Sequence, residues 1–262
     1  MDINVNEQLL KEQKYWEKEC YKPLIKEYQN NEAELVKLSC AFSFGVSRQY
    51  IESDKKIMII GQEANDHTFD YEKWCLSEWQ GWAISYLNRQ VNKEKNKEMG
   101  YNRSPFWRFF RKFAKGGYAP CWNNLDKVRT YVKKDGKDWK EDFLPYKTGS
   151  NEREILHRKI FDGNSKSLLE KEIEIAKPDI VVFVVGPNNP YYHSLSLAFF
   201  TGEEVDKRLE AVYPKPNNNE CCQEISDILG LNVPTYWTYH PNLLSRKKWL
   251  DTVVDKIICD NK

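Results

Sequence analysis

The feature that most constrains the fold is a continuous apolar run, Asp179 to Val185 (DIVVFVV), which is followed by Gly186. Its apolar residues do not alternate with polar ones, so a strand built from them must be covered on both faces. A second run, Lys56 to Ile60 (KIMII), has the same character and is followed by Gly61. Strands that are buried on both faces are typical of parallel sheets with helices on each side.

Helical and strand-like segments alternate along the rest of the chain. Two further strands are expected over residues 119–123 and 233–239. Helices are expected over residues 6–30, 72–90, 165–176, 221–230 and 246–258, and another begins at Ser104, because the Pro105 that follows suits the first helical position. This alternation predicts an α/β fold with three αβα layers around a central, mostly parallel four-stranded sheet.

The composition excludes several classes of protein. With 40 Lys and Arg against 39 Asp and Glu, the net charge of +1 argues against a strongly basic nucleic-acid-binding domain, although a local basic groove is compatible with it. The longest apolar run is far shorter than the ~18 residues of a membrane span, and no secretory signal is visible. The seven cysteines form no CxxC motif, which predicts reduced thiols and no metal or cofactor. We expect a cytoplasmic monomer without membrane contact.

Polar side chains follow each of the four expected strands. The segments are 61–67 (GQEANDH), 123–124 (NN), 186–189 (GPNN) and 240–242 (HPN). Because right-handed crossovers bring the carboxyl ends of parallel strands to one edge of the sheet, these four loops are expected to converge there. Carboxylates, amides and imidazoles at one edge can orient water and can donate and accept hydrogen bonds.

These segments resemble motifs of the uracil-DNA glycosylase superfamily. HPNLLS at 240–245 resembles the HPxxLS loop, and GQEANDH at 61–67 is similar to the water-activating GQDPYH loop. WNNLDKVR at 122–129 resembles a segment of the thermophilic-type enzymes, and SPFW at 104–107 resembles the segment that supplies a stacking Phe. The resemblance implies a single domain over residues 1–262, with an N-terminal helical extension at 1–50 and a helical or loop insertion at 67–103.

The resemblance also implies a reaction, the hydrolysis of the N-glycosidic bond of a uracil-like base that is flipped out of DNA. His240, as a neutral imidazole, would donate a hydrogen bond to the base oxygen that becomes negative. Glu63 or Asp66 would position water and face the cationic sugar. The base would be bound by Gln62, by Phe106 through stacking, and by Asn124, which would read its polar edge.

DNA contacts are implied for the end of the HPNLLS segment and for the basic residues that follow it. Leu244 has the position of the leucine wedge that fills the gap left by the flipped base. Ser245, Arg246 and Lys247 would contact phosphates, in part through the N-terminus of the last helix.

Two other hypotheses remain open. Glu63, Ala64 and Asn65 stand where the family has Asp, Pro and Tyr, which favours a catalytically diverged member of the same fold that binds nucleotide or nucleic acid without glycosylase activity. A metal-dependent hydrolase could instead use an acidic and imidazole set without diagnostic spacing. That set comprises Asp66, His67 and Asp70 with His193 or His240.

Overall fold

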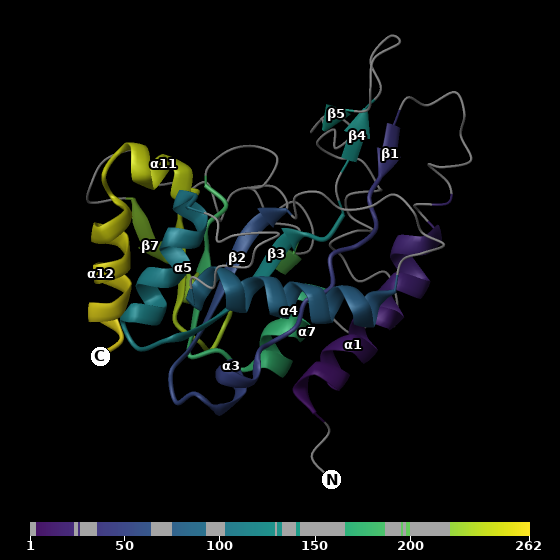
Figure 1. The fold of residues 1–262 in the computed structure, drawn as a ribbon, viewed down its shortest axis with the longest axis horizontal. Helices are drawn as coiled ribbons and strands as arrows, with labels where there is room; N and C mark the ends of the chain where they lie inside the picture. Colours follow the sequence, from purple (N-terminus) through teal and green to yellow (C-terminus); the bar gives the residue numbers. More distant parts are fainter. Residues whose placement is uncertain are drawn as a thin grey trace.

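A five-stranded sheet forms the centre of the computed structural model, with the strand order β3-β2-β6-β8-β7 (Figure 1). The strands are β2 (Lys56–Glu63), β3 (Ala119–Asp126), β6 (Ile180–Phe183), β7 (Cys222–Glu224) and β8 (Thr235–Thr238). Four of them run parallel, and β7 pairs antiparallel with β8 at one edge. The predicted α/β class with a mostly parallel sheet is therefore confirmed, but the sheet has five strands in place of the predicted four.

The structure describes residues 4–23, 26, 36–63, 75–92, 103–128, 130–132, 140–141, 166–186, 195, 198–199 and 221–262. Three short strands within these residues form a second, antiparallel sheet in the order β1-β4-β5. They are β1 (Val36–Leu38), β4 (Thr130–Val132) and β5 (Lys140–Glu141). None of the helices in this described part of the chain has the length and apolar character that crossing a membrane requires.

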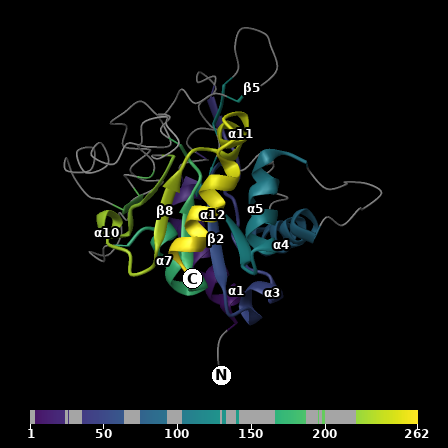
Figure 2. The ribbon, with the colours of Figure 1, turned by 90° about the vertical axis from the view of Figure 1, so that its left-hand side faces the viewer.

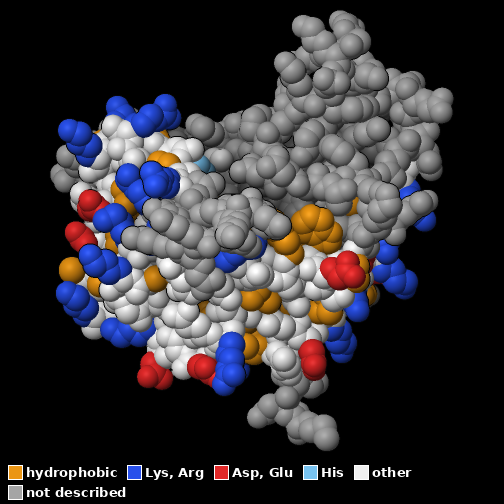
Figure 3. All heavy atoms as spheres, viewed as in Figure 1, with side chains coloured by type: hydrophobic (Ala, Val, Ile, Leu, Met, Phe, Trp, Pro, Cys, Tyr) orange, Lys and Arg blue, Asp and Glu red, His pale blue; other side chains and the backbone are white. Residues whose placement is uncertain are grey.

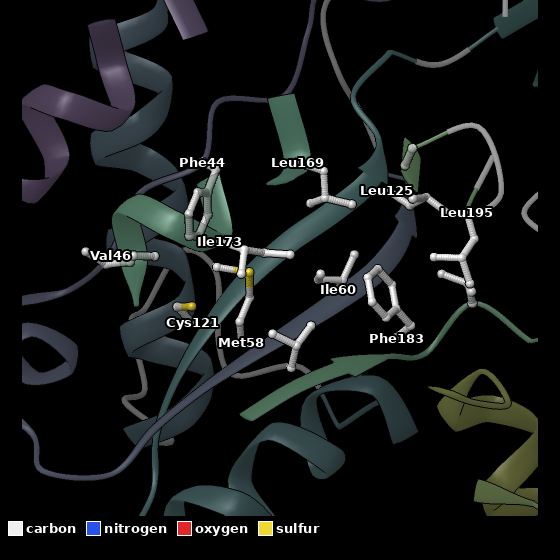
Figure 4. Packing of buried hydrophobic residues seen from close by; sticks show 14 of the residues in the cluster. Phe44, Val46, Met58, Ile60, Cys121, Leu125, Leu169, Ile173, Phe183 and Leu195 are labelled. Carbon is white, nitrogen blue, oxygen red and sulfur yellow. The ribbon is translucent and has the colours of Figure 1, made fainter. Parts of the chain in front are cut away.

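Helices cover both faces of the large sheet. Successive residues of β2 point to opposite sides, and since both sets are apolar, each face needs a covering layer. Ile57 and Ile59 pack in one core with residues of α5 (Pro105–Lys115) and α12 (Leu250–Asp260). Met58 and Ile60 pack in the other core, which includes residues of α1 (Val5–Trp16) and α7 (Leu168–Ala176) and is drawn in Figure 4. Figure 2 shows α4 and α5 on one side of β2 and α7 and α10 on the other.

The helix ends follow local sequence signals. The helix α5 begins at Pro105, as predicted. The helix α7 begins with a capping box, in which the Ser167 hydroxyl accepts from the Glu170 backbone N–H and the Glu170 carboxylate accepts from the Ser167 backbone N–H. The remaining helices are the π-helix η1 (Glu17–Tyr21), α3 (Arg48–Glu52), α4 (Leu76–Asn92), α10 (Ser226–Leu229) and α11 (Pro241–Arg246).

Two predicted helices were wrong in their extent. Residues 221–230 form β7 and the one-turn helix α10 rather than one helix, because 222–224 pair with β8 as an edge strand. The predicted helix over 246–258 is divided between α11 and α12. Lys248 adopts a left-handed backbone conformation (φ 62°). The Trp249 N–H then donates to the Leu244 carbonyl at 2.8 Å, which is the bond of a Schellman termination.

The N-terminal segment packs into the main body of the protein. Leu9 of α1 is buried in the core between the sheet and α7, and residues 39–47 are buried as well. Within the predicted insertion at 67–103, the helix α4 buries Ala83 and Leu87 in the two cores. Residues 67–74 and 93–102 lie outside the described part of the chain.

Candidate active site

Two of the predicted site residues, Asn124 and Phe106, lie beside Gly61, where β2 and β3 lie in register. Gly61 is aligned with Asn124, and a Cβ atom built on Gly61 would lie 2.8 Å from the Asn124 Oδ1 atom. The same Cβ atom would lie 3.4 Å from the ring of Phe106 on α5. The Phe106 ring is nearly parallel to the His240 imidazole, at 17° and with 5.9 Å between ring centroids. Segments far apart in the sequence therefore place an amide and an aromatic ring beside Gly61, and an imidazole beside that ring.

His240 directly follows the end of β8 and caps the N-terminus of α11. Its Nδ1 atom accepts the backbone N–H of Asn242 at 3.3 Å, so in the neutral ring the proton is on Nε2. Burial lowers the pKa of His240 from 6.5 to about 4, because a charged imidazolium is poorly solvated there. At neutral pH, His240 is therefore an uncharged side chain whose Nε2–H can act as a donor.

Asn124 is held at both its backbone and its side chain. Its backbone N–H donates to the Asn123 side-chain oxygen at 2.8 Å, and its Oδ1 atom accepts the indole N–H of Trp122 at 3.1 Å. The side chain is buried, with 1% of the residue exposed. Its Nδ2 atom has no hydrogen-bond partner among the described residues. A buried donor without a partner costs free energy that a bound acceptor would recover.

Two glycines let neighbouring groups approach the backbone closely at the site. Gly61 could not become Ala without displacing the Asn124 oxygen, since 2.8 Å is shorter than real Cβ contacts. Gly186 follows β6 and has a φ of 68°, which favours glycine. A Cβ atom on Gly186 would lie 3.6 Å from the backbone nitrogen of His240. The glycines that follow the two apolar runs of the sequence therefore both lie against site residues.

The half-buried Gln62 joins two strand ends. Its Nε2 atom donates to the Val185 carbonyl at 2.8 Å, which links the end of β2 to the segment that follows β6. The structure therefore gives Gln62 a bracing role beside Gly61. Its predicted contact with a base stays a prediction.

An aromatic cluster supports the site from the α5 side. The Trp107 ring packs at 5.1 Å from Phe106 and at 5.2 Å from Trp122, in both cases edge to face. Tyr86 of α4 continues the cluster with an edge contact to Trp107 at 5.4 Å. It stacks at 5.0 Å on Trp82, which is 37% exposed. Close packing of this kind restricts the orientation of the Phe106 and Trp122 rings.

A buried ionic network lies on the opposite face of β3. The ammonium of Lys127 contacts the Glu172 carboxylate of α7 at 2.6 Å and also donates to the Asn123 side-chain oxygen. Asn123 and Gln13 of α1 both donate to Glu172, at 2.8 and 2.9 Å. Burial lowers the pKa of Lys127, opposed by the attraction of Glu172. Because the Asn123 oxygen also holds the Asn124 N–H, the network fixes the backbone at the site.

Sequence reasoning missed Trp122 and the network around Asn123. The strand was expected to end at Asn123, with Asn124 in the loop after it. Both asparagines instead lie inside β3, which extends to Asp126, and alternation sends them to opposite faces of the sheet. The signal that could have identified this is the pattern of the segment WNNLDK, in which Trp122 and Asn124 share a face if the strand continues.

The predicted role of Leu244 as a wedge is contradicted by its burial. Leu244 has 0% of its surface exposed and lies in the core formed by α5, α11 and α12. Its carbonyl also accepts the bond that terminates α11. A side chain packed in this core cannot enter DNA without breaking the core. The neighbouring Leu243 is only partly buried.

The predicted phosphate-binding residues lie at the C-terminal end of α11, and not at the N-terminus of the last helix as predicted. Ser245, Arg246 and Lys247 are at the C-terminal end of α11, and the last helix begins only at Leu250. A helix N-terminus therefore does not assist them. Arg246 and Lys247 are nevertheless exposed, and Ser245 accepts a hydrogen bond from Arg108 of α5 at 3.1 Å. Figure 3 shows Lys and Arg side chains gathered over α5, α11 and α12.

Part of the predicted site lies outside the described residues. These residues are Asp66, His67, Asp70 and His193, together with the side chain of Glu63. The backbone of Glu63 is the last residue of β2 and is aligned with Asp126. Within the residues that the structure does describe, no group of three or more His, Cys, Asp or Glu side chains could hold a metal ion. A scan of the chain against models of known protein families finds no match, and a search of curated proteins finds no relative.

Proposed function

We propose that this protein is a DNA glycosylase that hydrolyses the N-glycosidic bond of a flipped-out, uracil-like base. The observation that carries the proposal is the position of Phe106, which lies beside Gly61 and the Asn124 amide oxygen and has its ring nearly parallel to the His240 imidazole. An aromatic face, a buried amide donor and a neutral imidazole donor are the groups that bind a flat heterocycle and stabilise charge on its carbonyl oxygen. DNA as the partner and a cytoplasmic location are parts of this proposal.

The proposed reaction exchanges one bond at the sugar. The bond between the sugar C1′ atom and the base nitrogen breaks, a water oxygen bonds to C1′, and the proton released by that water neutralises the departing base. Negative charge develops on the base and positive charge on the sugar in the transition state. His240 would stabilise the negative charge through its Nε2–H, because Nδ1 already accepts from Asn242. Glu63, with Asp66, is proposed to orient the water.

Exposed basic residues beside the site support DNA as the substrate. Arg108 and Arg103 belong to α5 and the segment before it, and Arg246, Lys247 and Lys248 belong to the end of α11. The bond from Arg108 to Ser245 joins these two elements. Cations on one face give the local attraction for phosphates that the net charge of the whole chain does not supply.

The test is direct. The protein is incubated with single-stranded and double-stranded oligonucleotides that contain uracil, hypoxanthine or xanthine, and abasic sites are revealed by alkaline cleavage. We expect cleavage of at least one substrate and a loss of about 10²–10³ in rate for His240→Ala, the usual effect of removing one such donor. Lys115→Gln, an exposed change at the far end of α5, is the control. Absence of abasic sites on every substrate, or a His240→Ala rate within a few-fold of wild type, would refute the proposal.

Binding without catalysis is the second candidate, and one observation favours it. The Nδ2 atom of Asn124 is a buried donor without a described partner, which calls for a ligand but not for a reaction. The replacement of the family's Asp, Pro and Tyr by Glu63, Ala64 and Asn65 affects the water-activating loop alone. This candidate predicts that uracil raises the thermal midpoint of the protein while no oligonucleotide is cleaved.

A further inference from the structure

A partly exposed face of α4 carries a strip of aromatic rings that ends in an arginine. The strip consists of Trp79, Trp82, Tyr86 and Arg89, which are spaced three or four residues apart and therefore lie along one side of the helix. We propose that this strip binds an unpaired nucleobase that flanks the base in the candidate site, so that the protein prefers single-stranded DNA to duplex DNA. This inference rests on the proposed function and specifies the form of its substrate.

The strip holds its exposed ring in a defined orientation. Trp82 stacks on Tyr86, with 14° between the ring planes and 5.0 Å between the centroids, and Trp79 meets Trp82 edge to face at 5.4 Å. Trp82 still has 37% of its surface exposed. Figure 3, in the view of Figure 1, shows hydrophobic side chains at the surface along α4. A ring that its neighbours already hold in place loses little entropy when a flat ligand stacks on it.

The strip is continuous with the candidate site. The Tyr86 ring contacts Trp107 edge to face at 5.4 Å, and Trp107 contacts Phe106 in the same way at 5.1 Å. Phe106 is the ring that lies beside Gly61 and nearly parallel to His240. A short series of ring contacts therefore connects the exposed indole to the ring that is predicted to stack on the target base.

The charges along the strip fit a nucleic acid strand. The Arg89 guanidinium lies over the Tyr86 ring at 5.8 Å, so the strip itself contains a cation. At the same end of α4, Arg111 of α5 donates to the Gln90 carbonyl at 2.9 Å, and the acidic Glu78 lies in the first turn, at the opposite end. Aromatic faces for bases, next to cations for phosphates, are the groups with which proteins bind single strands. Cations would add nothing to the binding of an apolar partner.

A duplex cannot use the strip in the same way. The faces of paired bases are covered by the neighbouring bases, so a base reaches Trp82 only after it has left the double helix. In a single strand the base is available without that cost. Stacking of one base on an aromatic side chain corresponds to a factor of about 5–150 in affinity. The strip therefore favours the single strand.

The experiment measures DNA binding by fluorescence anisotropy, with a labelled single strand that contains no uracil and with the duplex of the same sequence. Wild type should bind the single strand more tightly. Trp82→Ala should weaken single-strand binding by about 5- to 150-fold and duplex binding much less, whereas Trp82→Phe keeps a ring and should lose little. Ile51→Ala on α3, where the side chain is 39% exposed, is the matched control and should bind as wild type does. Because Trp82 is uncharged, the salt dependence should be the same in Trp82→Ala as in wild type.

The outcomes separate the strip from the reaction. A single-strand affinity that is unchanged in Trp82→Ala, or that falls equally with the duplex affinity, overturns the stacking role and leaves the glycosylase proposal to its cleavage assay. The expected loss without cleavage of any substrate supports the strip and leaves binding without catalysis as the function. A wild-type protein that binds neither DNA overturns the inference.

Two further measurements address other roles of the strip. A wild-type dimer that Trp82→Ala converts to a monomer, with unchanged DNA affinity, would assign the strip to self-association and overturn the inference. If Trp82→Ala does not fold, wild type is photocrosslinked to a single strand that carries 5-iododeoxyuridine, and the crosslinked peptide is identified by mass spectrometry. A crosslink within residues 75–92 supports the inference, and crosslinks at other positions alone overturn it.

Discussion

Acid should destabilise this protein through His240, because burial disfavours the charged form of its imidazole. The pKa of His240 is lowered from 6.5 to about 4 by burial, while its neutral Nδ1 atom accepts the N–H of Asn242. A folded-state pKa below the unfolded value means that the unfolded chain binds the proton first. The stabilising contribution is therefore fully present above pH 6.5 and is lost as the pH falls from 6.5 towards 4.

The size of the effect follows from these two pKa values. A shift from 6.5 to about 4 corresponds to about 3 kcal/mol in total, at about 1.4 kcal/mol for each pKa unit. Between pH 7.5 and pH 5, most of this contribution disappears, so the free energy of unfolding should fall by about 2 kcal/mol through His240 alone. Other groups titrate in the same range, so the comparison must be made with a variant that differs only at this position.

The assay is urea denaturation of wild type and His240→Gln at pH 7.5 and pH 5. Wild type should lose about 2 kcal/mol more than His240→Gln between the two values, because Gln does not titrate. In parallel, proton NMR should show one imidazole resonance, absent in the variant, that titrates below pH 5. A resonance assigned to His240 that titrates near 6.5, or an equal loss of stability in both proteins, would refute the lowering of the His240 pKa by burial.

The remaining predictions concern packing around the site, and each is checked by denaturant unfolding. Gly61→Ala should cost about 1–3 kcal/mol, because the new Cβ atom overpacks the site; an unchanged stability would mean that Asn124 and Phe106 pack less closely against Gly61 than described. Lys127→Met should cost about 3–5 kcal/mol by leaving Glu172 buried and unpaired, and Lys127→Met with Glu172→Leu should recover much of the loss. Leu244→Ala should cost about 2–5 kcal/mol and Leu243→Ala distinctly less, and the reverse order would restore Leu244 as a surface wedge.

The fold class could be predicted because two apolar runs without alternation admit few other structures. The runs at Lys56 and Asp179 became β2 and β6 at the centre of the sheet, with helices on both faces. The edge strand β7 could not be predicted in the same way. It has three residues, only the first two of its side chains are shielded from solvent, and its conformation depends on pairing with β8 rather than on its own pattern.

The site could be predicted only as far as residue types reveal it. Phe106, Asn124 and His240 were expected together; the structure places Phe106 near the Asn124 amide at Gly61 and near the His240 ring, and their shared role stays a prediction. Leu244 was expected at the surface because its segment resembles a DNA-contacting loop, but the way α11 packs on α5 and α12 decides which leucine is buried. The bond from Trp122 to Asn124 depends on the strand continuing past Asn123, which its apolar residues do not indicate, although Trp122 and Asn124 share a face once it does.

Because Asn123 and Asn124 point to opposite faces of β3 and have different partners, the site is sensitive to the number of residues in this strand. Adjacent residues with the same side chain serve the ion pair on one side of β3 and the candidate pocket on the other. Inserting or deleting one residue earlier in this strand would send each side chain to the face that its neighbour now occupies. Substitutions in β3 therefore leave the alternation of its side chains intact. A one-residue insertion would instead turn Asn123 away from the ion pair and Asn124 away from Gly61 at the same time.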